Sequence, residues 1–353
     1  MKTEIIKIEK DPMDEDKLEY AAEVIRAGGL VAFPTETVYG LGANALDERA
    51  VKKIFEAKGR PSDNPLIVHI AQRSEADGLV KNKPAYASIL MERFWPGPLT
   101  LIMDKADVVP RTTTAGLGTV AVRMPSHPVA LALIRRSGLP IAAPSANTSG
   151  RPSPTCARHV IDDLYGKVDI IIDGGSAAVG LESTVLDITV SPPVILRPGG
   201  ITPEELEKGL GSVVGIDPGL LRKPAPDLLP KSPGMKYKHY SPKADVVIIE
   251  GTLEKVAAKI NTLIAEHEAG GMTVGVLATD QTKNLYPSKN TVISMGDRNS
   301  PENIAANLFK TLRKFDETGV RLILAEAVEN TGIGLAVMNR MTKAAGYNII
   351  RAD

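Results

Sequence analysis

The chain is poor in several residue types that mark whole classes of proteins. It has one cysteine, Cys156, among 353 residues, so no disulfide bond can form within it, and a reducing, intracellular compartment fits. That thiol would need a nearby base to act in catalysis. One cysteine and five histidines without ligand spacing argue against a structural zinc site. No uninterrupted apolar run reaches about 18 residues, so we expect no transmembrane helix.

The chain also has no excess of charge of either sign. The 42 basic and 42 acidic residues cancel, and the sequence pI is about 7, so nothing global attracts nucleic acid or an anionic membrane. Any anion site must therefore come from local clustering. The first ten residues have no long apolar core and no small-residue cleavage site, so we expect no signal peptide there. No acidic pair has metal spacing, and we expect no metal held by protein side chains.

The length fits two domains, and hydrophobic periodicity predicts an α/β fold. In the first two hundred residues, apolar strand patterns alternate with amphipathic helix patterns, and a capping box begins a helix at Thr202. The predicted strands are 4–8, 30–33, 66–70, 99–103, 120–123, 140–143, 168–172, 184–188 and 194–196. The predicted helices are 18–26, 49–57, 127–136 and 155–164, the last capped by Thr155.

Glycine and proline then accumulate over 211–242, which predicts a linker of about 30 residues that ends in a polar, aromatic and basic cluster at 232–240. Beyond it the alternation resumes and predicts a small α/β domain. The glycine turn at 331–334 favours a helix cap over a phosphate cradle. We therefore predict three parts, an α/β domain at 1–210, a linker at 211–243 and a smaller α/β domain at 244–353. The predicted C-terminal elements are strands 244–250, 273–277 and 321–325, and helices 252–268, 300–317 and 336–345.

The most informative segment is a helix-to-strand corner, KGRPSDNPLIVHI at 58–70. Gly59 ends the preceding helix, and Lys58, Arg60 and His69 lie around the corner. Two solvated charges near a helix C-terminus would be an ordinary arrangement. The asparagine and the two prolines, however, specify one loop shape, which favours an anion site.

Two further segments place hydroxyl groups and amides after buried strands. PTETVYGLG at 34–42 is either a turn rich in side-chain-to-backbone bonds or the lining of a small polar site. PIAAPSANTSGRPSPT at 140–155 leaves a strand and enters a helix, which suits phosphate binding, although it is not a Walker A loop.

One arginine ends a predicted buried strand, and another follows such a strand directly. Arg123 either pairs with an internal carboxylate or holds a ligand carboxylate. Arg197, beside Gly199 and Gly200, remains open between a structural and a binding role, and the Ser183-Thr184 pair would ordinarily be structural. This inventory of cations, hydroxyls and amides serves positioning and charge stabilisation, as in phosphoryl or nucleotidyl transfer.

Taken together, these segments resemble the YrdC-like threonylcarbamoyl-AMP synthase family in its longer, two-domain form. The resemblance spans nearly the whole chain. Further matching motifs are WPGPLTL (95–101), TVAVRMPSHP (119–128), ESTVLDI (182–188), ILRPGGIT (195–202), PGMKYKHYSP (233–242) and AVMNRMTKAAGY (336–347).

The resemblance implies a YrdC-like twisted mixed sheet with helices around a central basic cavity, plus a smaller Rossmann-like α/β C-terminal domain. It implies a cytoplasmic nucleotidyltransferase that makes threonylcarbamoyl-AMP and pyrophosphate from L-threonine, bicarbonate and ATP, with Mg²⁺ carried in by ATP. A partner complex would transfer the threonylcarbamoyl group to the tRNA adenosine beside the anticodon.

The resemblance also assigns site residues, with Lys58 and Arg60 as the catalytic pair. Tyr240, with His239 or Lys236, would close over the site as a lid. The residues implied for L-threonine are Thr35, His69, Arg123, Ala143 and Ser183. The residues implied for ATP are Lys58, Arg60, Asn64, Thr119, Ser145, Asn147, Ser153, Arg197 and Tyr240.

Two other functions compete. An RNA-binding translation or ribosome factor would also use basic side chains, but the neutral pI and the scarcity of basic-aromatic alternation outside 236–240 argue against it. A transferase that uses carbamoyl phosphate would share the carbamoyl-adenylate chemistry.

Overall fold

The computed structural model describes residues 2–9, 13–222, 230–233 and 239–352. The described chain forms two compact units. The first takes the described residues up to Ser149, Ser153–Leu220 and 230–233, and the second takes Gly150–Pro152, residues 221–222 and the described residues from 239 onward. The boundaries 1–210, 211–243 and 244–353 stay a prediction.

The first unit is built on a mixed sheet of eleven strands within the described residues, in the order β1-β8-β2-β3-β7-β4-β6-β5-β9-β10-β11. Neighbouring strands pair in both senses, since β4 and β6 are parallel whereas β6 and β5 are antiparallel. Its strands are β1 (Glu4–Lys7), β2 (Val31–Phe33), β3 (Gly40–Asn44), β4 (Ile67–His69), β5 (Leu99–Asp104), β6 (Thr119–Arg123), β7 (Ile141–Ala142), β8 (Ile170–Asp173), β9 (Thr184–Asp187), β10 (Val194–Arg197) and β11 (Gly215–Ile216).

The helices of this unit begin and end at the signals that the sequence supplies. Asp47 caps α2 through its side chain, and Gly59 ends it in the left-handed conformation at φ 60°. Thr202 and Glu205 form the predicted capping box of α6. The helices are α1 (Glu15–Arg26), α2 (Glu48–Lys58), η1 (Arg73–Gly78), α3 (Ala85–Phe94), α4 (Pro128–Ser137), α5 (Ala157–Leu164), α6 (Pro203–Leu210) and η2 (Pro218–Leu221).

The two faces of the sheet are covered unequally. One face carries the large core, in which Val68, Val122 and Leu186 from the sheet pack with residues of α2, α3, α5 and α6. The opposite face is covered by α1 and α4 over β2, β7 and β8. Over β4, β6, β5, β9 and β10 this second face carries a small apolar cluster whose buried members all come from strands. Those members are Ile67, Ile102, Ala121, Val185 and Leu196.

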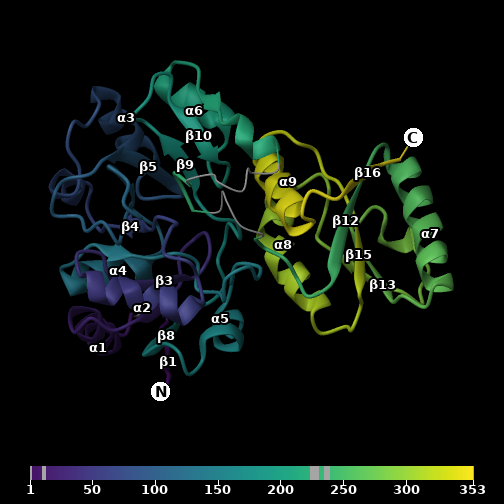
Figure 1. The fold of residues 1–353 in the computed structure, drawn as a ribbon, viewed down its shortest axis with the longest axis horizontal. Helices are drawn as coiled ribbons and strands as arrows, with labels where there is room; N and C mark the ends of the chain where they lie inside the picture. Colours follow the sequence, from purple (N-terminus) through teal and green to yellow (C-terminus); the bar gives the residue numbers. More distant parts are fainter. Residues whose placement is uncertain (1, 10–12, 223–229, 234–238, 353) are drawn as a thin grey trace. The chain divides into compact units, whose positions relative to one another are not determined.

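The second unit has a parallel sheet of five strands within the described residues, in the order β14-β13-β15-β12-β16. Figure 1 shows α7 on one side of this sheet and α8 and α9 on the other, which is a doubly wound, Rossmann-like arrangement. Its elements are β12 (Asp245–Glu250), α7 (Leu253–Ala269), β13 (Val274–Ala278), η3 (Lys283–Leu285), β14 (Thr291–Ser294), α8 (Pro301–Phe315), β15 (Leu322–Glu326), α9 (Ile333–Ala344) and β16 (Ile349–Arg351).

The predicted α/β class is confirmed, but several local predictions are wrong. Cys156, not Thr155, is the N-cap of α5. Strand β3 begins within the segment 34–42, where no strand was predicted, and α3, β14 and β16 were not predicted either. The 211–242 segment is not all irregular, because β11 pairs with β10 and η2 follows it. The glycine turn at 331–334 is a helix cap as predicted, with Gly332 the N-cap of α9. None of the helices in the described ranges is long and apolar enough to cross a membrane.

Two threonine caps allow a matched test of stability. Thr202 accepts from the Glu205 amide, whereas Thr252 caps α7 without a side-chain hydrogen bond. We expect Thr202→Ala to destabilise the first turn of α6 by about 1 kcal/mol, and so to speed amide exchange there about fivefold. Thr252→Ala should change exchange in α7 much less. Equal effects in the two helices would contradict the capping assignment.

Candidate functional site

The half-face of the sheet that carries the small apolar cluster also presents polar side chains. Residues two apart along a strand lie on the same face. His69 therefore shares the face of Ile67, and Arg123 that of Ala121. His69 and Arg123 are also direct partners in the parallel β4–β6 pairing. Two of the residues predicted for threonine are thus neighbours on one surface.

Arg123 forms a buried ion pair. Its Nη2 lies 2.7 Å from Oε1 of Glu36, and its Nε donates to the Gly97 carbonyl at 3.2 Å. Arg123 is 4 % exposed, so its charge needs this compensation. Of the two roles left open for Arg123, pairing with an internal carboxylate is therefore present. The other oxygen of Glu36, Oε2, is buried without a hydrogen-bond partner in the described part of the chain.

The imidazole of His69 is neutral at physiological pH. Burial, together with the positive charge of Arg123, lowers the pKa of His69 to about 3. The ring meets Phe33 edge-on, with centroids 6.3 Å apart. Its Nδ1 is buried and has no hydrogen-bond partner within the described residues. A neutral ring with a free polar atom can accept or donate a hydrogen bond to an uncharged part of a ligand.

Ser183 and Arg197 lie together at the adjoining strand ends. Arg197 donates from Nε to the Ser183 carbonyl and from Nη2 to the Ser183 hydroxyl, both at 3.0 Å. A register irregularity between Ile195 and Arg197 interrupts the alternation of β10, and such a bulge redirects a side chain. The Ser183 hydroxyl also lies 2.7 Å from that of Thr100. A Cβ at Gly199 would lie 2.3–2.4 Å from backbone atoms of residues 182–184, so only glycine fits there.

The predicted cationic corner is a second cluster. Lys58 ends α2 and is 2 % exposed. Its Nζ donates to the carbonyl oxygens of Ser145 and Asn147, each at 2.5 Å, and lies 3.4 Å from Oδ1 of Asn147. The Lys58 carbonyl in turn accepts from the Ser149 amide. The lysine therefore joins the end of α2 to the loop between β7 and α5.

Arg60 and Asn64 lie on the other side of this corner. Nη2 of Arg60 donates to the Asn64 carbonyl at 3.3 Å, and the guanidinium lies 5.9 Å from the centre of the Phe55 ring. The side-chain amide of Asn64 is completely buried, yet neither Oδ1 nor Nδ2 has a hydrogen-bond partner in the described ranges. A buried amide left unsatisfied costs about 1–3 kcal/mol, so it needs an explanation.

The remaining predicted residues of the first unit lie in loops or at the ends of strands. The Thr35 hydroxyl donates to the Val38 carbonyl at 2.6 Å, as in a side-chain-to-backbone turn. Ala143 donates its amide to Ile67, and Ser145 donates its hydroxyl to Asn147 Oδ1 at 2.6 Å. Thr119 begins β6. The Ser153 hydroxyl donates to Glu182 Oε1 at 2.5 Å.

Two carboxylates belong to these clusters although no role was predicted for them. Glu36 is paired with Arg123, and Glu182 with Ser153. Both are buried. Each lies inside a motif that already drew attention, PTETVYGLG and ESTVLDI, and a buried acid beside a strand end was the signal that could have marked them.

Of the three predicted lid residues, His239 and Tyr240 are described by the structure, whereas Lys236 lies outside the described residues. Tyr240 belongs to the second unit, where it is buried with φ at 64°, stacks on Phe309 at 5.2 Å and lies 5.4 Å from the Arg340 guanidinium. His239 lies beside Tyr240, with ring centres 5.6 Å apart.

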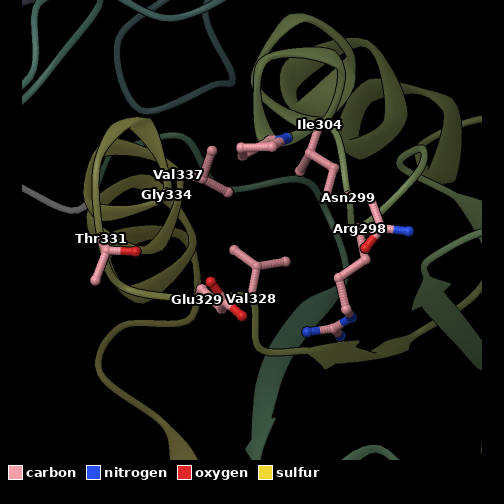
Figure 2. Close-up of a pocket in the computed structure, with 9 residues that line it drawn as sticks. Arg298, Asn299, Ile304, Val328, Glu329, Thr331, Gly334 and Val337 are labelled. Atoms are coloured by element: carbon pink, nitrogen blue, oxygen red, sulfur yellow. The ribbon is translucent and has the colours of Figure 1, made fainter.

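The second unit also has a cavity of about 190 Å³. Figure 2 shows Arg298 and Asn299 from the loop after β14 on one side, and Thr331 and Gly334 at the start of α9 on the other. None of the predicted site residues lines it. Among the described residues, no group of three or more histidine, cysteine, aspartate or glutamate side chains could hold a metal ion.

Comparisons with known proteins agree along the whole chain. A family model described as "Telomere recombination" (Sua5, YciO, YrdC) matches residues 23–199, and one described as "Threonylcarbamoyl-AMP synthase, C-terminal domain" matches 201–346. The threonylcarbamoyl-AMP synthase of Pyrococcus abyssi is 56 % identical over 97 % of this chain and 98 % of its own, and that of Bacillus subtilis 53 % over 96 % and 95 %. A crystal structure of P. abyssi Sua5 complexed with L-threonine superposes with a TM-score of 0.94 at 55 % identity, over 99 % of this chain and all of that one.

The pKa of His69 predicts a pH dependence of stability. The pKa of His69 is about 3 in the folded chain and about 6.5 in the unfolded chain. Between these two pH values the imidazole is protonated in the unfolded chain and neutral in the folded chain. The free energy of unfolding should therefore fall as pH drops from about 6.5 towards 3. We expect His69→Asn to lose less stability than the parent between pH 7 and 5, measured by urea unfolding at each pH. Parallel pH profiles for the two proteins would show that His69 is protonated normally.

Proposed function

The chain belongs to the threonylcarbamoyl-AMP synthase family, a family of nucleotidyl-transferring enzymes in tRNA modification, and from this premise we propose how its first unit uses L-threonine, bicarbonate and ATP. The threonine nitrogen forms a bond to the carbon of bicarbonate, losing protons as water departs, to give a carbamate. A carbamate oxygen then attacks the α-phosphorus of ATP, and pyrophosphate leaves. The products are threonylcarbamoyl-AMP and pyrophosphate.

The threonine end of the site lies on the half-face of the sheet. The Arg123 guanidinium is the group suited to the substrate carboxylate, since it can bind it through two parallel hydrogen bonds. Glu36 already pairs with that guanidinium, so the substrate carboxylate has to share Arg123 with Glu36 or take its place. Neutral His69 and the Ser183 hydroxyl complete the polar lining, with Thr35 and the Ala143 backbone.

The nucleotide end lies at the cationic corner, where Lys58 and Arg60 neutralise the carbamate and the triphosphate. The observation that carries this proposal is the Asn64 side chain, completely buried with both polar atoms unsatisfied in the described chain. A polar ligand explains that arrangement, because buried amides are otherwise hydrogen-bonded. Thr119, Ser145, Asn147, Ser153 and Arg197 are the further groups proposed for ATP.

Mg²⁺ would reach this site with ATP and supply Lewis-acid neutralisation of the phosphates. The donor set fits such a metal. Cations and amides dominate the cationic corner, and the nearby buried acids Glu36 and Glu182 already accept from Arg123 and Ser153, so phosphate oxygens rather than a protein cage would hold the ion.

We further propose a lid for the site, an acceptor for its product and a location for the enzyme. Tyr240 would leave its stack on Phe309 and close over ATP, excluding water from the short-lived carbamate. The adenylate would pass to a complex that modifies the tRNA adenosine beside the anticodon. We place the enzyme in the cytoplasm, which the single cysteine supports.

Loss of either cation at the corner tests the nucleotide site. We expect Lys58→Ala and Arg60→Ala to lower the rate of product formation about 10²–10³-fold, the usual cost of removing one charge-stabilising group. Lys52→Ala, an exposed lysine on the same helix, is the matched control and should leave the rate unchanged. Mass spectrometry of threonylcarbamoyl-AMP and a pyrophosphate assay give the rates. Parent-like turnover in either corner variant would refute the assignment.

Arg123→Lys tests the threonine site, since lysine keeps the charge but loses the planar fork. We expect the KM for threonine to rise about tenfold or more, with the KM for ATP little changed, because one charge-assisted hydrogen bond is worth about 1.5–3 kcal/mol. Arg111→Lys, at an exposed arginine, is the control. An equal rise in both KM values would place Arg123 outside a dedicated threonine site.

A further inference from the structure

The loop between β7 and α5 is held at both ends in the first unit. Residues proposed for ATP lie on each side of its middle, Ser145 and Asn147 before it and Ser153 after it. Lys58 fixes the carbonyls of the first two, and Glu182 accepts from the Ser153 hydroxyl. The Thr148 amide donates to Asp163 at 3.1 Å.

The middle of the same loop belongs to the second unit. Gly150–Pro152 groups with the described residues from 239 onward rather than with the chain on either side. Gly150 has φ at 90°, which favours glycine, and its carbonyl accepts from the Ser241 amide at 2.9 Å. Three consecutive residues of a proposed nucleotide loop are thus secured by a distant part of the sequence.

Two side chains at the C-terminal end of α8 make further contacts with Gly150–Pro152. Arg313 is buried and donates from Nε at 3.1 Å and Nη2 at 2.5 Å to the Pro152 carbonyl. Asp316, three residues later, pairs with Arg151 at 3.1 Å and accepts the Lys243 amide at 2.7 Å. The Asp316 side chain is only 6 % exposed, so its two partners shield it from water.

We infer that Arg313 and Asp316 are positioning residues for the nucleotide. They fix Gly150–Pro152, and through the continuous chain they set where Asn147 and Ser153 present their amide and hydroxyl groups. This inference rests on the proposed ATP site. Misplacing a binding group by about 1 Å can lower the rate as much as 10²-fold. A loop that is fixed at both ends and in its middle keeps its binding groups in place.

Steady-state kinetics on the full chain test the inference. We expect Arg313→Ala to raise the KM for ATP about tenfold while leaving the KM for threonine within about twofold, because charge-assisted bonds to the loop are lost. Arg313→Lys, which can still donate to the Pro152 carbonyl, should recover part of the loss. Lys314→Ala, at the exposed neighbour on the same turn of α8, should behave as the parent.

Asp316→Asn is the second variant, chosen because an amide oxygen can still accept from Lys243 while the charge that holds Arg151 is gone. We expect a rise of several-fold in the KM for ATP. Amide hydrogen exchange over 148–153 in the ligand-free chain should be faster in both Arg313→Ala and Asp316→Asn than in Lys314→Ala.

Failure of the proposed function and failure of the positioning role give different results. If the parent makes no threonylcarbamoyl-AMP, the proposed function is refuted. An active parent with parent-like KM for ATP in both Arg313→Ala and Asp316→Asn would overturn the positioning role. Equal rises in the KM for ATP and for threonine, or slow exchange at 148–153 in the variants, would also overturn it.

Discussion

The site depends on burying the Lys58 ammonium against the dipoles of its own chain. A charge that is 2 % exposed must be solvated by the protein, and the carbonyls of Ser145 and Asn147 do this. The bond network determines where α2 can end, and Gly59 allows it to end there. Because Ser149 returns a hydrogen bond to the Lys58 carbonyl, helix and loop fix each other. In the proposed nucleotide site, a substrate anion would therefore meet a cation whose position is already set.

Buried charges on the half-face of the sheet also need partners within the protein. Helices α1 and α4 bury the apolar residues over β2, β7 and β8. Over the neighbouring strands the cluster is too small to form a second core, and charged side chains occupy the space beside it. Arg123 and Arg197 are each buried with partners that lie at strand ends, a carboxylate in one case and a serine in the other. Removing the Glu36 carboxylate would take from the buried Arg123 charge its ion-pair partner, which is why Glu36 matters to stability.

Much of this could be predicted from local signals. The alternating pattern, the cap at Thr202 and the stop at Gly59 are properties of a few adjacent residues, and the structure confirms them. Strand β3 was missed because Gly40-Leu41-Gly42-Ala43-Asn44 has no β-branched residue, and its strand conformation comes from pairing with β2 and β7. The role of Arg123 was left between two alternatives because its partner, Glu36, is 87 residues away. Nor could the sequence separate Gly150–Pro152 from the loop around them, since contacts with residues 161 positions later define their unit.

That separation has a consequence for how the protein is made. Arg313 is translated 161 residues after Pro152. At about 5–20 residues per second this interval is roughly 8–30 s. During it, the nascent chain lacks Arg313 and Asp316, which hold the middle of the proposed nucleotide loop. If that loop binds ATP as proposed, its final conformation forms only after most of the chain has been translated.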